Sequence, residues 1–236
     1  MTDNNTCADN DTCAIDPRSA AGAERTLEPG PGKHVLYFGD PMCSWCWGFA
    51  PELRRIVEAV EGGAQFHLVM GGLRPGTTDA WDAAMRRDIR HHWQDVEKKS
   101  GQPFNFARFD DEAFVYDTEP ACRALVSVRA LAPDGVLSFY ESLQRGFYAE
   151  GLNIVDPTVL ADLAQKQGLD HDAFSALFNA PEARAQVAFD FNRTRAFGVS
   201  GFPTVLCADN GQYAFLTLGY RPFTTMAELL QEWLNA

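Results

Sequence analysis

Residues 38–51 have the sequence FGDPMCSWCWGFAP, and the expected fold is built outward from this stretch. A short apolar run precedes it at 35–38, and apolar residues with helical spacing follow it at 53–60. Cys43 and Cys46 therefore stand between a strand and the start of a helix. The unpaired N–H groups and the dipole of a helix N-terminus stabilise a thiolate, which is the reactive form of cysteine. Because three-residue spacing places both sulfurs on one helix face, the pair can close a disulfide.

Composition limits the classes of protein that this chain belongs to. Its 236 residues are 46% hydrophobic, enough for one large domain or a domain with a substantial insertion. The net charge of −12 argues against nucleic acid and anionic membrane surfaces as partners. No apolar run approaches the roughly 20 residues of a membrane span. The polar start, MTDNN, lacks a signal sequence, so we expect a cytoplasmic protein, in which disulfides are usually transient and catalytic.

Residues 1–32 are rich in Asp, Asn, Thr, Ala, Pro and Gly, and we expect a disordered tail there. Cys7 and Cys13 lie in this tail. They are either exposed thiols without a role or an auxiliary pair that exchanges disulfides with the main site. Metal binding is a weaker alternative, because no histidine is near and the spacing is unusual for a metal site.

The remaining chain divides into three parts. A strand at 65–70 follows the first helix, and helical patterns then run almost without interruption to residue 197. Strand patterns return at 204–208 and 213–218, joined by the turn sequence DNG, and a final helix follows. We therefore predict an α/β chain of order β-α-β, helical block, β-β-α. Residues 33–72 and 198–236 form the sheet domain, and 73–197 form an all-helical insertion domain.

Four stretches carry a resemblance to a known family. They are YFGDPMCSWCW at 37–47, GGLRPG at 71–76, YDTEPAC at 116–122 and GVSGFPT at 198–204. With these stretches the chain resembles the DsbA-like branch of the thioredoxin superfamily, in which an all-helical domain is inserted into a thioredoxin-like fold. It looks most similar to the FrnE-type cytosolic members, and the resemblance covers residues 33–236. It implies a cis peptide bond between Phe202 and Pro203 that faces the cysteine pair.

Two departures from the family pattern bear on the chemistry. The oxidising DsbA proteins have Pro-His between their cysteines, where this chain has Ser44-Trp45. A histidine there helps to lower the thiol pKa, so we expect a less perturbed Cys43 and a less oxidising disulfide. Many relatives also have a buried acid six residues before the first cysteine. Tyr37 occupies that position here, which leaves Asp40 as the nearby candidate for a proton acceptor.

The predicted catalytic residues are Cys43 and Cys46, with Asp40 and Ser44 in supporting positions. Cys43 attacks a substrate disulfide to form a mixed disulfide, and Cys46 then attacks Cys43 and releases the product. The competing interpretations are a structural disulfide and half of a zinc site. A zinc site needs four ligands, and the sequence offers no second paired motif, so we predict no metal.

Five residues are predicted to meet the substrate. Pro203 holds Phe202 so that its backbone pairs with an extended peptide, which is recognition by strand addition. Trp45 either forms an apolar lip for the substrate or packs against the protein. Arg74 and His92 are candidates for the cleft between the two domains, although each also suits a solvated surface.

The sequence favours a thiol–disulfide oxidoreductase acting on protein or small-molecule disulfides, of the DsbA-like oxidoreductase or isomerase type. A reductase or glutathione resets the site, and we expect no cofactor other than glutathione as a co-substrate. One alternative is a glutathione-dependent isomerase or transferase, related to 2-hydroxychromene-2-carboxylate isomerase and the kappa-class transferases. Those usually have serine in place of the nucleophilic cysteine, so the presence of both cysteines argues against it. The other alternative is a non-catalytic binding or chaperone module.

Overall fold

The computed structural model describes residues 29–236. Cys7, Cys13 and nearly all of the predicted tail lie outside the described residues. None of the helices within 29–236 combines the length and the apolar character of a membrane span.

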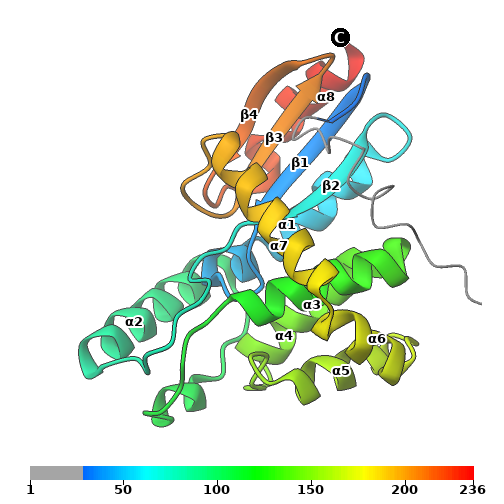
Figure 1. The fold of residues 1–236 in the computed structure, drawn as a ribbon. Helices are drawn as coiled ribbons and strands as arrows, with labels where there is room; N and C mark the ends of the chain where they lie inside the picture. The colour runs from blue at the N-terminus through cyan, green and yellow to red at the C-terminus, as the bar shows by residue number, and fades with distance from the viewer. Residues whose placement is uncertain (1–28) are drawn as a thin grey trace, which may run out of the picture.

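A four-stranded sheet forms the upper part of the molecule in Figure 1. Its order is β2-β1-β3-β4, and β1 (Lys33–Gly39) runs parallel to β2 (Gln65–Met70). Helix α1 (Ser44–Val60) connects these two strands, as a parallel pair requires. Strand β3 (Thr204–Asp209) pairs antiparallel with β1 and with β4 (Gln212–Leu218). The predicted α/β fold class and the predicted order of elements along the chain are confirmed.

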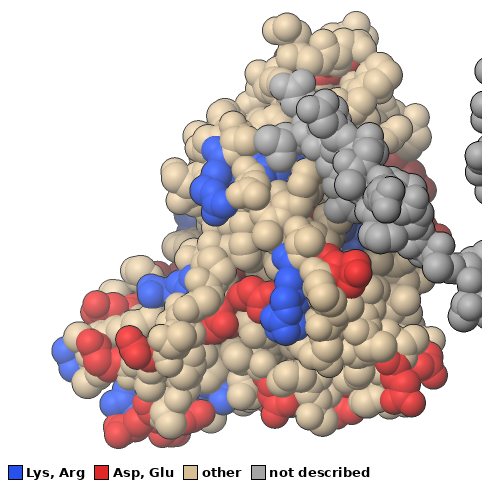
Figure 2. Space-filling model, in the orientation of Figure 1, with Lys and Arg blue, Asp and Glu red and all other residues tan. Residues whose placement is uncertain are grey.

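The chain between β2 and β3 is helical, and Figure 1 shows most of it below the sheet. In Figure 2 most of the acidic side chains visible on this face lie on that helical part. The helices and 3₁₀ turns of this part are α2 (Ala83–Ser100), η1 (Phe106–Asp110), α3 (Glu119–Leu131), η2 (Pro133–Gly135), α4 (Val136–Tyr148), α5 (Pro157–Lys166), α6 (His171–Asn179) and α7 (Pro181–Ala196). The turn η3 (Phe223–Thr225) and helix α8 (Ala227–Asn235) end the chain. The exact domain boundaries stay a prediction.

Local sequence signals account for several element ends. The Asp156 side chain accepts a hydrogen bond from the Thr158 N–H, which caps α5, and Pro157 follows at the first helical position. In the β3–β4 hairpin, Asn210 and Gly211 have φ of 47° and 80°. Both residue types tolerate this left-handed conformation, which suits a two-residue hairpin turn.

The two faces of the sheet belong to different apolar clusters. Val35 and Tyr37 of β1 belong to the large core, which also contains the buried face of α1. Leu36 and Phe38 alternate with them and pack on the opposite face, where Phe197 after α7 covers them. Helix α7 therefore reaches from the helical part onto the sheet (Figure 1).

An ion pair attaches this helical part to edge strand β2. Arg129 of α3 and Asp190 of α7 pair at 2.9 Å. Arg129 also donates to the Leu68 carbonyl at 3.0 Å, and Asp190 accepts from the Met70 N–H at 3.0 Å. The pair thus satisfies polar backbone groups at an edge that would otherwise be open to another strand. Asp190 is almost fully buried, which makes its hydrogen bonds hard to replace by water.

We predict that Asp190→Ala lowers the free energy of unfolding by about 3 kcal/mol, because it leaves Arg129 and the Met70 N–H without their buried acceptor. Denaturant unfolding followed by circular dichroism measures this change. The matched control is Glu112→Ala, which removes the exposed partner of Arg86 and should change stability by less than about 0.5 kcal/mol. Equal losses in the two variants would contradict the anchoring role of Asp190.

Candidate active site

The cysteine pair lies at the start of α1, just after the turn that connects β1 to this helix. Cys43 is the N-cap residue of α1, and its N–H donates to the Asp40 carbonyl at 3.1 Å. Cys46 lies in the first turn of the same helix. Both are free thiols in this structure. Cys43 is 6% exposed and Cys46 is fully buried, so Cys43 is the thiol that a substrate reaches first.

Two opposing effects act on the Cys43 thiol. Its hydrogen bond with the Cys46 side chain and its burial raise the pKa of Cys43 well above the usual value. The N–H of Cys46, in the first helical turn, lies toward the Cys43 sulfur and lowers that pKa. A negative charge on the neighbouring Cys46 sulfur hinders ionisation of Cys43 and adds to the rise of its pKa.

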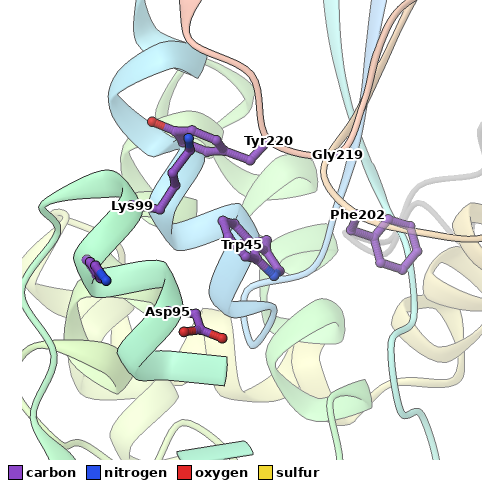
Figure 3. Close-up of a pocket in the computed structure, with 7 residues that line it drawn as sticks. Trp45, Asp95, Lys99, Phe202, Gly219 and Tyr220 are labelled. Atoms are coloured by element: carbon purple, nitrogen blue, oxygen red, sulfur yellow. The ribbon is translucent and has the colours of Figure 1, made fainter. Parts of the chain in front are cut away.

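The Phe202–Pro203 peptide bond is cis and lies against the cysteine pair. The Cys43 thiol donates to the Phe202 carbonyl at 3.6 Å, although 159 positions separate the two residues. In Figure 3 the Phe202 ring points away from Trp45. It packs so closely on Gly71 that a Cβ atom at Gly71 would lie 2.2 Å from the ring. The backbone of Phe202, rather than its side chain, faces the site.

A cavity of about 670 Å³ opens beside this loop. Trp45 of α1 forms one wall, and its ring lies 5.9 Å from that of Tyr220. Figure 3 shows Trp45, Asp95 and Lys99 around a common space. The complete lining is Trp45, Asp95, Lys98, Lys99, Phe202, Gly219 and Tyr220. Its walls come from both sequence segments of the sheet domain and from α2.

Asp40 is fully buried, and its carboxylate joins separate segments. It accepts from the Met42 N–H at 2.9 Å and from the Leu73 N–H at 2.7 Å, and the Cys122 thiol donates to it at 3.5 Å. Burial raises the pKa of the Asp40 carboxyl, and these two N–H bonds oppose the shift. Neither Cys43 nor Cys46 is among its hydrogen-bond partners within residues 29–236. Its role as a proton acceptor stays a prediction, whereas its structural role is visible.

Arg74 and His92 do not line the cavity. The exposed Arg74 guanidinium lies 5.7 Å from the centre of the Tyr116 ring, and its backbone pairs with Thr118. His92 is exposed on α2, and the neighbouring Trp93 takes the buried position instead. Trp93 is buried and His92 is not, because burying the larger apolar side chain removes more apolar surface from water.

Sequence reasoning missed several residues near the pair. Lys98 and Lys99 line the cavity, and the signal available was a basic pair at the end of a helix in an acidic chain. The hydroxyls of Tyr140 in α4 and Tyr37 in β1 form a hydrogen bond. Local sequence patterns do not predict it, because 103 positions separate the two residues. Ser44 is the first residue of α1 and is partly exposed. No group of three or more potential metal ligands occurs in the described part of the chain.

The sequence of residues 34–231 matches the family described as the DSBA-like thioredoxin domain. The chain belongs to this family. The thioredoxin-like sheet of this chain, with helices inserted between β2 and β3, agrees with this assignment.

Solved structures of similar proteins agree with this assignment. A candidate protein disulfide isomerase from Nitrosomonas europaea is 35% identical and has a TM-score of 0.81, over 86% of this chain and 98% of that one. The cytosolic disulfide reductase DsbM from Pseudomonas aeruginosa is 28% identical, with a TM-score of 0.72 over 86% of this chain and all of that one. DsbM has also been solved with GSH. The chain thus has the fold of DsbA-like thiol–disulfide oxidoreductases.

A curated relative has a different kind of name. The ClpXP adapter protein SpxH of Shouchella clausii is 27% identical over 229 residues, which cover 94% of this chain and 73% of that protein. This relative is named for adapter activity and not for a thiol reaction.

We predict that Gly71→Ala disturbs the loop facing Cys43, because the new Cβ would overlap the Phe202 ring. Such overpacking costs about 1–3 kcal/mol of stability, and we expect slower disulfide exchange as well. Denaturant unfolding and a reductase assay measure the two effects. The control is Gly201→Ala in the same loop, where a Cβ meets nothing within 4 Å. A Gly71 variant as stable and active as the control would show that Phe202 is free to move.

Proposed function

We propose that this protein is a cytoplasmic thiol–disulfide oxidoreductase that works through Cys43 and Cys46. The observation that carries the proposal is the placement of Cys43. It is the N-cap residue of α1, and its thiol donates at 3.6 Å to the carbonyl before a cis proline. The helix N-terminus favours a thiolate at Cys43 and opposes the burial that raises its pKa, and Cys43 is the less buried thiol of the pair.

The proposed reaction transfers two electrons from the protein to a disulfide. The Cys43 thiolate attacks one sulfur of the substrate, breaks its S–S bond and releases the first substrate thiolate, which takes up a proton. The Cys46 sulfur then attacks Cys43 in the mixed disulfide and releases the second substrate thiol. The proton lost by Cys46 ends on that leaving sulfur. The protein is left with a Cys43–Cys46 disulfide that a thiol donor must reduce.

Glutathione is the thiol donor that we propose for this step. It carries two carboxylates and one ammonium group, and the cavity beside Trp45 offers Lys98 and Lys99 together with Asp95. Basic side chains at this cavity are notable in a chain with a net charge of −12, because the overall charge repels an anionic ligand. The similarity to DsbM, which has been solved with GSH, supports the same assignment. Its description as cytosolic also supports a cytoplasmic location for this chain.

A binding function is the alternative that the name of the curated relative favours. An adapter recognises a partner through a surface and needs no thiol chemistry. Replacement of Cys43 would then leave the function intact, which separates this alternative from the redox proposal. A glutathione-dependent isomerase or transferase would likewise have no use for Cys46.

We predict that Cys43→Ser abolishes disulfide reduction, because no other thiol of the pair is exposed enough to begin the exchange. Cys46→Ser should accumulate mixed disulfides with the substrate, since the second attack is lost. Turnover assays and mass spectrometry of the trapped species measure the two effects. Cys207→Ala removes a buried thiol of β3 outside the pair and should retain activity. Full activity in both serine variants would rule out the mechanism.

We predict that replacing Lys98 and Lys99 together by alanine raises the KM for glutathione roughly fivefold, because exposed ion pairs are each worth up to about 1 kcal/mol. The value of kcat should change little, since neither lysine touches the sulfurs. Steady-state reduction of a small disulfide at varied glutathione measures both constants. Lys166→Ala on α5 is the charge-matched control and should leave KM unchanged. An unaltered KM in the double variant would exclude this cavity as the glutathione site.

A further inference from the structure

Two buried tyrosines form a hydrogen-bonded chain behind Cys46. The Tyr37 hydroxyl lies beside the Cys46 side chain and interacts with it electrostatically. The hydroxyl oxygens of Tyr37 and Tyr140 are 3.2 Å apart, and the Tyr140 hydroxyl donates to the Asp40 carbonyl at 3.3 Å. Both tyrosine side chains are fully buried, so water does not compete for these bonds. Tyr37 belongs to β1 and Tyr140 to α4, so the chain joins the sheet to the helical insertion.

The surrounding residues hold this pair in place. The Tyr37 ring stacks on Phe49 at 6.1 Å and meets the edge of the Tyr140 ring at 5.9 Å. Gly39 leaves the space that both tyrosines need. A Cβ there would lie 2.6 Å from the Tyr37 ring and 2.7 Å from the Tyr140 hydroxyl oxygen. The two hydroxyl protons can rotate, while the packing of the rings keeps the two oxygens next to each other.

Each hydroxyl has one proton, so this chain has two consistent directions. When Cys46 is a thiol, its S–H points to the Tyr37 oxygen, Tyr37 donates to Tyr140, and Tyr140 donates to the Asp40 carbonyl. When Cys46 is a thiolate, Tyr37 donates to the sulfur and Tyr140 donates to Tyr37. The Asp40 carbonyl keeps a donor in both cases, because it also accepts from the Cys43 N–H at 3.1 Å. Neither arrangement leaves a buried polar group without a partner.

We propose that Tyr37 and Tyr140 are positioning residues that stabilise the Cys46 thiolate by reversing their hydrogen bonds during the second exchange step. The inference rests on the proposed function, because it concerns the attack of Cys46 on the mixed disulfide at Cys43. In that step the Cys46–Cys43 bond forms, the bond from Cys43 to the substrate sulfur breaks, and the Cys46 proton ends on the leaving sulfur. Neither tyrosine gains or loses a proton. Tyr37 changes from an acceptor of the Cys46 thiol into a donor to the thiolate, and Tyr140 changes from an acceptor of the Tyr37 hydroxyl into a donor to it.

Three titratable side chains interact electrostatically with Cys46, namely Cys43 at the N-cap of α1, Tyr37 of β1 and Tyr140 of α4. Of these, the two tyrosines carry hydroxyl donors. Asp40 is negative when ionised, and its carboxylate is taken up by two backbone N–H groups and the Cys122 thiol. Burial, then Cys46 itself, raises the pKa of Tyr37 well above its usual value. Tyr37 therefore keeps its proton and remains a donor.

The test is the reaction of the fully reduced protein with Ellman's reagent, followed in a stopped-flow spectrometer, with Cys7 and Cys13 replaced by alanine in every variant so that their thiols do not contribute. Cys43 releases the first aromatic thiolate, and attack by Cys46 releases the second. We expect Tyr37→Phe to leave the first phase within about twofold and to slow the second phase about tenfold, the effect of losing a hydrogen bond to a charged group. The pH at which the second phase reaches half its maximal rate should move upward. Tyr140→Phe should slow the second phase less, because it acts through Tyr37.

Tyr148→Phe is the matched control, because it removes a buried hydroxyl from the same helix α4 that bonds neither cysteine. Both of its phases should match those of the unaltered protein, and thermal unfolding confirms that all three variants are folded. Unchanged second phases in Tyr37→Phe and Tyr140→Phe would overturn the inference. The proposed function is checked separately, because it requires Cys46→Ser to lose the second phase altogether.

Discussion

The rest of the site depends on the hydrogen bonds that the buried Asp40 carboxylate accepts from two backbone N–H groups. This carboxylate lies at the end of β1 and holds the Met42 and Leu73 N–H groups, so it fixes both the turn before α1 and the loop after β2. The carbonyl of the same residue accepts from the Cys43 N–H. Burying a carboxylate is costly unless hydrogen bonds replace its water, and here the surrounding turn supplies them. The position of Cys43 at the start of α1 follows from this turn.

Much of the fold can be predicted from the sequence because its signals are local. The apolar run before Cys43, the DNG turn and the Asp-Pro start of α5 each act within a few residues, and the structure has the corresponding elements. The family resemblance added the cis bond at Pro203, which no local pattern reveals. The order of strands and helices was therefore accessible before any coordinates.

The surroundings of the cysteines were less accessible, because they depend on contacts between distant segments. His92 was predicted for the cleft between the two domains, but it is exposed on α2 and does not line the cavity beside Trp45. Asp40 was selected because it is the nearest acid in the sequence, but its hydrogen bonds go to the backbone and to Cys122. Tyr140 lies on a helix of the insertion, and only the packing of α4 against α1 brings it to the site.

Helices α2 and α4 belong to the helical insertion, yet both contribute to the surroundings of the cysteines. The sheet domain and the insertion are therefore not independent modules. A sheet domain cut free of the helices would keep Cys43 and Cys46 but lose Tyr140 and one wall of the cavity. Exchange of the helical block between relatives would likewise replace half of the environment of the thiols. Redox behaviour in this fold therefore belongs to the combination of the two parts, and chimeras are expected to differ from both parents.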